Sequence, residues 1–239
     1  SMRRSDGVIF LTDYAANTVQ ETTGKIHHFA VIPHGVAEAF KQTTSGGVWS
    51  KEQGAEIRCL YVSNALPYKH QWSVIRAIGH LRKRGHNVSL LLAGGGTGRA
   101  QRLLEKEMER VDPHGQFVKQ IGFVSHDRVP SVIASADIFV FASSCENMPN
   151  TLVEAMAGGL PIASSDRGPL PEILKDGGVY FDPENPTSIS TAIEKLIANE
   201  ELRISIAVRA KELSEKYSWS RCASETWNFL RTTIAEYNR

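Results

Sequence analysis

The sequence has no apolar run that approaches the roughly 20 residues a helix needs to cross a membrane. A run such as Leu90–Ala93 reads as a buried strand. The first residues show no signal-peptide pattern, and Ser1-Met2 reads as a cleavage scar in front of a piece of a longer protein. We therefore expect a cytoplasmic protein that associates at most peripherally with the inner face of a membrane.

Cysteine is scarce, and no metal-ligand spacing is present. The three cysteines, Cys59, Cys145 and Cys222, are far apart and form no CxxC pair, which argues against a disulfide framework and for a reducing compartment. The histidines without metal-ligand spacing are His27, His28, His70, His80, His86, His114 and His126. We interpret them as surface or core residues.

Strong net charge is also absent. The formal net charge is +1, so no overall field recruits nucleic acid or an anionic membrane. Hydrophobic residues make up 41% and charged residues 22% of the 239 positions, which is ordinary globular composition. A chain of this length buries roughly 70–75% of its unfolded surface, so it needs no disulfide or structural metal to be stable.

The sequence does contain a regular alternation of strand and helix patterns. Strands are expected at 57–62, 88–93, 117–122, 138–141, 160–163 and 179–181, and helices at 71–84, 100–111, 127–135, 150–157, 186–199, 200–216 and 221–237. This order indicates βαβ units with right-handed crossovers. The predicted fold is α/β, a Rossmann-like parallel sheet flanked by helices.

The first 56 residues are less regular. A helix is expected over 13–23, with Thr12 as its N-cap and Gly24 as its end, followed by a strand over 28–32. Residues 41–56 are poor in apolar groups and read as a mobile loop.

Ligands of parallel sheets bind beyond the carboxyl ends of the strands. Glu146, Gly122 and the segments 64–69 and 94–96 all follow predicted strands, so we expect them to share one rim. The run 144–161 is the most informative part of it. It places Glu146 before a helix start and Glu154 just inside the helix. Free N–H groups and the helix dipole favour phosphate, and carboxylates accept hydrogen bonds from sugar hydroxyls.

The glycine run after the strand at 88–93 does not make a dinucleotide fingerprint. Gly94 and Gly96 are followed by Arg99, where the G-x-G-x-x-G pattern needs a glycine. We interpret the run as a tight turn, which weighs against an NAD-type dehydrogenase.

Several short motifs together resemble the C-terminal domain of retaining GT-B glycosyltransferases, the group 1 or family-four transferases. They are VIPHGV at 31–36, YVSNALPYKH at 61–70, LLAGGG at 91–96, IGFV at 121–124 and the Glu-x7-Glu run from 146 to 154. The resemblance covers nearly the whole chain. Its most specific part is the Glu-x7-Glu run with its AMAGGLP tail.

The resemblance implies one half of a GT-B fold. Residues 1–35 would end the N-terminal domain and form the interdomain linker, 36–220 would bind the nucleotide sugar, and 221–239 would pack back toward the missing domain. The full protein would transfer a hexose-type sugar from a nucleotide diphosphate sugar, UDP- or GDP-linked, to a hydroxyl of a glycan, polysaccharide or lipid-linked acceptor. It would do so with retention and without a metal or other cofactor. We expect this chain alone to bind nucleotide weakly and to transfer nothing.

Three residues match the charged positions of the family site. Glu154 would bind the ribose hydroxyls, or else simply stabilise a helix start. Glu146 would lie beside the transferred sugar as stabiliser or nucleophile, or else be an exposed loop acid. Lys69 would offset charge on the departing diphosphate, or else be a surface lysine. Asn64 stands where the family often has an arginine, so one positive charge fewer faces the leaving group.

The remaining candidates would bind mainly through the backbone. The N–H groups expected to cradle sugar and phosphates belong to Asn147, Met148, Asn150, Thr151 and Leu152. Asn150 reads equally as a helix N-cap. Gly122, Phe123 and Val124 would meet the base, although Phe123 reads equally as a core residue. Gly35 follows His34, which lines the cleft or makes a turn.

Other interpretations of the rim stay open. Arg167 reads as an ion-paired surface residue or as a neutraliser of diphosphate. A sugar-nucleotide epimerase of the same fold and a nucleotide-binding module without catalysis are the alternative functions. None of these interpretations includes a nucleic-acid partner.

Overall fold

The computed structural model of the protein describes residues 2–42, 49 and 54–237. Its main sheet is wholly parallel, with the strand order β5-β4-β3-β6-β7-β8. The strands are β3 (Ile57–Val62), β4 (Val88–Ala93), β5 (Val118–Ile121), β6 (Ile138–Phe141), β7 (Ile162–Ser165) and β8 (Val179–Phe181). The predicted Rossmann-like sheet is confirmed.

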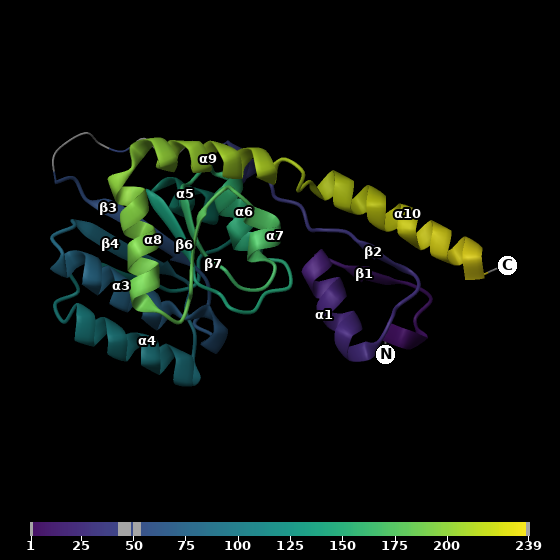
Figure 1. Ribbon diagram of the computed structural model, residues 1–239, viewed down its shortest axis with the longest axis horizontal. Coiled ribbons are helices and arrows are strands. Elements are labelled where there is room, and N and C mark those ends of the chain that lie inside the picture. The colour runs from purple at the N-terminus through teal and green to yellow at the C-terminus, as the bar shows by residue number, and fades with distance from the viewer. Residues whose placement is uncertain (1, 43–48, 50–53, 238–239) are drawn as a thin grey trace.

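Helices cover both faces of this sheet (Figure 1). They are α2 (Glu38–Lys41), α3 (Gln71–Lys83), α4 (Gly98–Val111), α5 (Val129–Ala134), α6 (Asn150–Ala157), α7 (Leu170–Leu174), α8 (Pro186–Ala198) and α9 (Glu200–Ser214). Helix α3 packs between α4 and α8 on one face, and α6 packs against α9 on the other. None of the described helices is long and apolar enough to serve as a membrane span.

The central strands explain the core. All four residues of β6 are buried, as expected for a strand covered on both faces. Tyr61 of β3 and Phe141 of β6 are fully buried and pack edge to face, with ring centroids 5.7 Å apart. Helix α3 turns its buried Val74, Ile78 and Leu81 toward the sheet at helical spacing.

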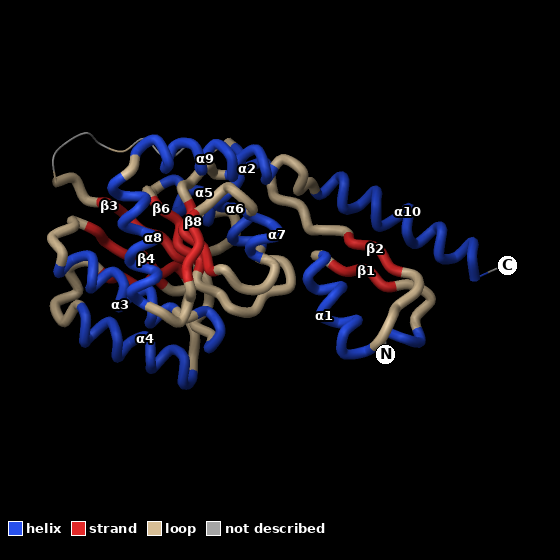
Figure 2. The backbone as a smooth tube through the Cα atoms, in the orientation of Figure 1, coloured by secondary structure: helices blue, strands red, loops and turns tan. Residues whose placement is uncertain are grey.

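A small module lies beside the main sheet (Figure 2). It consists of β1 (Val8–Phe10), α1 (Asp13–Thr23) and β2 (Phe29–Val31), with β1 and β2 paired in parallel. Thr12 caps α1 as predicted, since its side chain accepts a hydrogen bond from the N–H of Ala15. Gly24, with φ of 82°, ends the helix.

The last helix, α10 (Trp219–Tyr237), runs along this module rather than along the main sheet (Figure 1). The ring of His28 stacks on Phe229 with centroids 4.8 Å apart, and its Nε2 lies 2.8 Å from Thr233 Oγ1. The two ends of the chain therefore meet in one small unit.

Some predicted boundaries were wrong. The strand expected over 160–163 begins at Ile162, because Leu160 and Pro161 belong to the turn that leaves α6. The helix expected over 127–135 is shorter, at 129–134. The short elements α2 and α7 were not predicted, since neither exceeds five residues. Most of the loop predicted over 41–56 lies outside the described residues.

Candidate functional site

The candidate site lies at the position in the main sheet where the strand order reverses. Strands β3 and β6 are neighbours in the sheet, but the chain leaves them toward opposite sides. The loops that follow these two strands therefore diverge and leave a crevice at the carboxyl edge. Lys69 ends the short 3-10 helix Pro67–Lys69 in the loop after β3, and Glu146 lies in the loop after β6.

These two side chains form an ion pair. Lys69 Nζ donates to Glu146 Oε1, and the two side chains are only 12% and 13% exposed. The ammonium also lies 5.3 Å and 5.2 Å from the ring centroids of Tyr68 and Phe141. Aromatic faces favour a cation, so the lysine is held at a defined place. The sequence predicted both residues as catalytic, and the structure brings them into contact.

The loop that carries Lys69 is held by hydrogen bonds to β3 and to the loop after β6. The carbonyl of Lys69 accepts a 2.7 Å hydrogen bond from the hydroxyl of the buried Tyr61. The carbonyl of Tyr68 accepts one of 2.8 Å from the N–H of Ser144, and His70 Nε2 lies 2.8 Å from the hydroxyl of Ser144.

Two further features shape this loop. His70 takes a left-handed conformation with φ of 47°, which turns the chain from the loop into α3. Burial lowers the pKa of His70, so its imidazole stays neutral near neutral pH. Together with the hydrogen-bonded carbonyls of Tyr68 and Lys69, the conformation and neutral imidazole of His70 make the loop a pre-organised support for the Lys69 side chain.

Glu154 lies in the second turn of α6, the helix that follows the loop of Glu146. It is 8% exposed, and its Oε1 lies 3.1 Å from Nε2 of His126, whose side chain is 69% exposed. Burial raises the pKa of Glu154, and the hydrogen bond from His126 opposes that rise. The helix-start interpretation of Glu154 does not describe this geometry, because the carboxylate is buried against a partner on another loop.

His126 was missed by the sequence analysis. Its pairing with a carboxylate is not predicted by the sequence, because the absence of metal-ligand spacing says nothing about such a pair. The one available signal was its place just after Gly122–Val124, on a segment already expected at the rim.

The start of α6 differs from the prediction in one respect. Asn150 is the first helical residue rather than the N-cap, which is Pro149, and no side chain caps the helix. Asn150 Oδ1 lies instead 3.3 Å from Nδ1 of His34. The N-cap interpretation of Asn150 was wrong, because the helix begins one residue earlier than that role requires.

Two of the five expected N–H donors are already in use. The N–H groups of Asn150 and Leu152 bond to the carbonyls of Met148 and Pro149, both at 3.0 Å. The N–H groups of Asn147, Met148 and Thr151 have no acceptor among the described residues. These three are the better candidates for an oxyanion cradle.

The other predicted rim segments do lie together. The N–H of Ala65 bonds to the carbonyl of Gly95 at 3.1 Å, and a Cβ on Gly95 would stand 4.0 Å from the Cα of Gly122. Gly94 has φ of 127°, and a Cβ there would lie 2.4 Å from the carbonyl oxygen of Ser63. The glycine run is thus a tight turn against the loop after β3, as predicted.

Phe123 is 86% exposed beside this turn, so its interpretation as a core residue was wrong. Val124 is half-buried and packs against the main core. Asn64 is exposed at the rim. Gly122 stands open, because a Cβ added to it would meet no described atom within 4 Å.

Gly35 and His34 lie against the start of α10. A Cβ on Gly35 would stand 2.1 Å from the backbone N of Trp219, so a glycine is needed there for packing. The ring of His34 stacks on Trp219 with centroids 5.6 Å apart while its Nδ1 faces Asn150. His34 therefore reaches the edge of the crevice. Any binding role of Gly35 stays a prediction.

Arg167 forms ion pairs with Asp166 at 3.2 Å and with Asp182 at 3.3 Å. Its guanidinium is about half exposed, which agrees with the surface-pair interpretation. Among the residues that the structure describes, no group of three or more His, Cys, Asp or Glu side chains could hold a metal ion.

The small module touches the crevice directly. Thr12 donates a 3.1 Å hydrogen bond to the carbonyl of Asn147, in the loop that carries Glu146. A residue of the N-terminal module is therefore bonded to the loop that the sequence marked as most informative.

Comparisons with known proteins identify the family of the chain. The family described as Glycosyl transferases group 1 matches residues 50–213. An uncharacterized glycosyltransferase of Methanocaldococcus jannaschii is 32% identical over 190 residues, which are 78% of this chain and 48% of that protein. The chain thus spans about half the length of this curated relative.

Solved structures share the fold. Sucrose-phosphate synthase from Thermosynechococcus elongatus superposes with a TM-score of 0.86 at 19% identity, over 98% of this chain and 60% of that one. The Anabaena protein HepE, in complex with UDP and glucose, superposes with a TM-score of 0.82 at 19% identity, over 95% and 63%. The chain therefore belongs to the glycosyl transferases group 1 family, and its fold is that of the C-terminal Rossmann-like half of a GT-B glycosyltransferase.

Proposed function

We propose that the chain is the donor-binding half of a glycosyltransferase. The full protein would transfer a hexose-type sugar from a nucleotide diphosphate sugar to an acceptor hydroxyl, with retention and without a metal. The observation that carries the proposal is the ion pair of Lys69 and Glu146 at the switch point of the sheet, followed along the chain by the buried Glu154 in α6.

The charge pattern suits a leaving diphosphate. Lys69 is paired with Glu146, and the N–H groups of Asn147, Met148 and Thr151, which follow Glu146 along the chain, have no acceptor among the described residues. An ammonium and N–H dipoles together favour the negative charge that builds on the departing diphosphate. Protein groups would thus supply the stabilisation that a metal ion supplies in other transferases.

Glu146 would act on the sugar. When a diphosphate competes for Lys69, the carboxylate of Glu146 is left close to the anomeric centre. A carboxylate there stabilises an oxocarbenium-like transition state or attacks it as a nucleophile, and both routes are compatible with retention.

Glu154 would hold the ribose. A carboxylate accepts two hydroxyl hydrogen bonds in a fork, which matches a vicinal diol. His126 contacts one oxygen of this carboxylate at 3.1 Å, so it would orient the carboxylate, and each oxygen would keep a lone pair for a ribose hydroxyl. The exposed Phe123 on the same segment would lie near the base.

The comparison with HepE supports a nucleotide donor, since that protein was crystallised with UDP and glucose. The acceptor, a glycan, polysaccharide or lipid-linked saccharide, would be bound by an N-terminal domain. In this view the small module of residues 1–35 ends that domain and α10 packs back against it.

An exposed apolar stripe on α10 supports the proposal that another domain packs against this helix. Trp227, Leu230 and Ile234 lie at helical spacing on α10 and are 72%, 42% and 61% exposed. The opposite side of α10 already holds Phe229 against His28. The stripe is therefore a second apolar face of one helix, as expected for a helix that another domain covers.

Calorimetric titration of the chain with UDP, GDP and ADP tests donor binding. We expect weak binding of one nucleotide and no sugar transfer by the chain alone. Robust transfer by the isolated chain would contradict the half-enzyme proposal. For the full protein, product analysis with donor alone separates an epimerase from a transferase, and unchanged transfer after Glu146→Ala would leave only a binding role for this half.

A further inference from the structure

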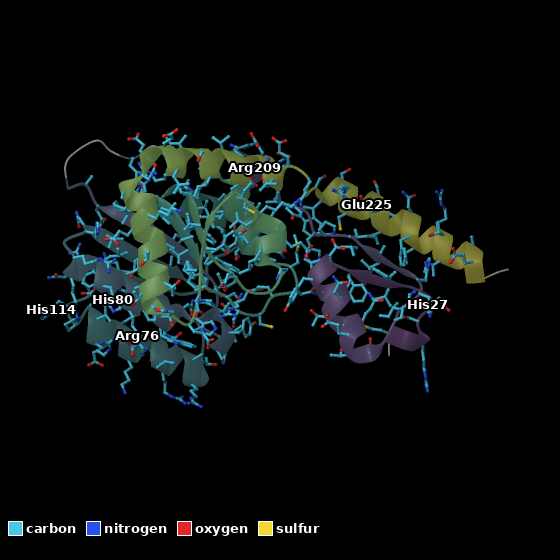
Figure 3. All side chains as sticks on the ribbon, viewed as in Figure 1. His27, Arg76, His80, His114, Arg209 and Glu225 are labelled. Carbon is cyan, nitrogen blue, oxygen red and sulfur yellow. The ribbon has the colours of Figure 1, made fainter. Side chains whose placement is uncertain are left out.

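A second polar feature lies away from the candidate site, in a cavity of about 320 Å³ between α3 and α4. Every titratable side chain that lines this α3–α4 cavity is basic: Arg76, His80, Arg82, Lys83 and Arg110. Figure 3 shows Arg76 and His80 at the end of the molecule remote from α10. Nothing in the proposed transfer reaction uses these residues.

Two of the arginines are held in place by one buried carboxylate. Glu107 is 4% exposed and accepts hydrogen bonds from Nε and Nη2 of Arg76, at 2.9 and 2.7 Å. It also accepts bonds from Nε and Nη2 of Arg110, at 2.9 and 2.8 Å. Each guanidinium keeps Nη1 for another acceptor, and a fixed fork loses little entropy when it binds one.

The remaining cations leave a local excess of positive charge. Arg82 bonds to the neutral side chain of Asn87 at 2.7 Å, and exposed Lys83 has no ion-pair partner within the part of the chain that the structure describes. The nearby carboxylate of Asp112 accepts hydrogen bonds from three backbone N–H groups, at 2.7 to 2.9 Å, and its charge also attracts Arg82. Four permanent cations therefore line the cavity, and the carboxylate of Glu107 is the one that pairs with them among the described residues.

The positive charge of the cluster also affects the pKa of His80, which lines the cavity. Burial lowers the pKa of His80, and the charges of Arg84, Lys83 and Arg110 lower it further. A bound anion would oppose these charges.

The helix dipole explains only part of the cluster. His80, Arg82 and Lys83 are in the last turn of α3, where cations are favoured in any helix. Arg110 is in the last turn of α4, where the same preference holds, so Arg76 is the residue of the cluster that the helix dipoles leave unexplained. The two helices approach closely because Gly79 has no side chain, since a Cβ there would lie 2.7 Å from Val111 Cγ1.

We propose that the α3–α4 cavity binds a phosphate-type polyanion, either a soluble diphosphate or the phosphorylated head group of a lipid. Both present tetrahedral oxyanions with two or more negative charges. The Nη1 groups of Arg76 and Arg110 would donate to them in the planar manner that arginine favours, and Lys83 would add a point charge. Along α3, Arg76 lies about 8 Å and His80 about 14 Å from Gln71 at the start of the helix, so this site is offset from the loop that carries Lys69.

Titration with sodium pyrophosphate at constant low ionic strength tests the proposal, with the imidazole signals of His80 followed by NMR. We expect a saturable change at His80, an upward shift of its pKa, and no change at His27 in the small module. Lys83→Ala and Arg110→Ala should each weaken binding by about tenfold. Lys195→Ala is the matched control, because Lys195 is an exposed lysine in the last turn of α8.

Vesicle binding separates the two sources of the anion. Sedimentation with phosphatidic acid vesicles but not with phosphatidylcholine vesicles, abolished by Lys83→Ala, would assign the head group. Pyrophosphate binding without vesicle binding would assign the soluble ligand. The proposal fails if His80 does not respond above about 1 mM pyrophosphate, if sulfate and chloride act equally (an adventitious ion only), or if Lys195→Ala weakens binding as much as Lys83→Ala.

Discussion

The carboxylate of Glu172, in the first turn of α7, accepts a 2.8 Å hydrogen bond from the backbone N–H of Tyr14, near the start of α1. Its other oxygen accepts a 3.0 Å bond from the N–H of Asp13. One carboxylate thereby satisfies two of the N–H groups that a helix start leaves without partners. It joins the small module to the main sheet across 158 positions of sequence.

Removing this carboxylate should loosen the small module. We expect Glu172→Ala to lower the free energy of unfolding by about 1 kcal/mol, because two charge-assisted hydrogen bonds are lost at a half-buried site. Amide exchange of Tyr14 should accelerate. Glu201→Ala is the control, since Glu201 lies exposed in the first turn of α9. Equal effects of both variants on urea unfolding would show that the bonds from Glu172 contribute nothing specific.

The pair of Lys69 and Glu146 should show strong coupling in stability. Lys69→Met leaves a carboxylate with 13% exposure and without an ion-pair partner among the described residues, which we expect to cost roughly 2 kcal/mol. Adding Glu146→Gln removes the unpaired charge, so the double variant should recover most of that loss. Chemical denaturation of the two single variants and the double variant measures the coupling. Strictly additive effects would mean that the ion pair is not formed in solution.

The same pair should affect transfer by the full protein in a characteristic way. Glu146→Gln should lower kcat by roughly 100-fold while KM for the donor changes little, because the carboxylate acts mainly on the transition state. Steady-state kinetics with the donor chosen by calorimetry checks this. A rise in KM with unchanged kcat would instead assign Glu146 to ground-state binding.

Glu154 and His126 should act together on nucleotide binding. We expect Glu154→Ala to weaken binding by about tenfold, since a buried acceptor for two hydroxyls is lost. His126→Ala should weaken it by a few-fold, and His126→Gln less, because an amide can still donate to the carboxylate. Calorimetry on the chain is sufficient. Our ribose assignment is wrong if Glu154→Ala leaves the affinity unchanged.

Glu107 should give the protein a distinct acid sensitivity. The hydrogen bond from Arg76, together with that from Arg110, lowers the pKa of Glu107 to about 2 in the folded state. A lowered folded-state pKa stabilises the fold above the unfolded value of 4.5, and this contribution is lost as the pH falls toward 2. Allowing for solvent around the half-exposed guanidinium groups, we expect about 2 kcal/mol.

The variant Glu107→Gln isolates this contribution. It should be less stable than the parent at pH 7, and the difference should shrink steadily between pH 4.5 and 2. Urea unfolding across that range is the measurement. A difference that does not depend on pH would point to packing rather than charge.

Much of the architecture follows from local pattern. The alternation of apolar strands with amphipathic helices is a short-range property, so β3, β4, β6 and α6 were predicted with their observed bounds. The run 144–161 could be predicted as a candidate site, because the carboxylates, the helix start and the preceding strand are adjacent in sequence.

The contacts within the site could not be predicted from local sequence patterns. The pairing of Lys69 with Glu146 spans 77 positions and depends on β3 and β6 being neighbours, which periodicity does not reveal. His126 meets Glu154 only because the loop after β5 reaches across the sheet edge.

The sequence by itself determined the kind of fold, the family and the edge of the sheet where the chemistry would lie. It did so because strand and helix periods, turn residues and short motifs are properties of neighbouring positions. Only the tertiary structure decided that Lys69 and Glu146 form an ion pair, that Glu154 has a histidine partner and that Gly35 is needed beneath Trp219. Those facts depend on how distant segments approach one another, and that is set by the packing of the whole chain.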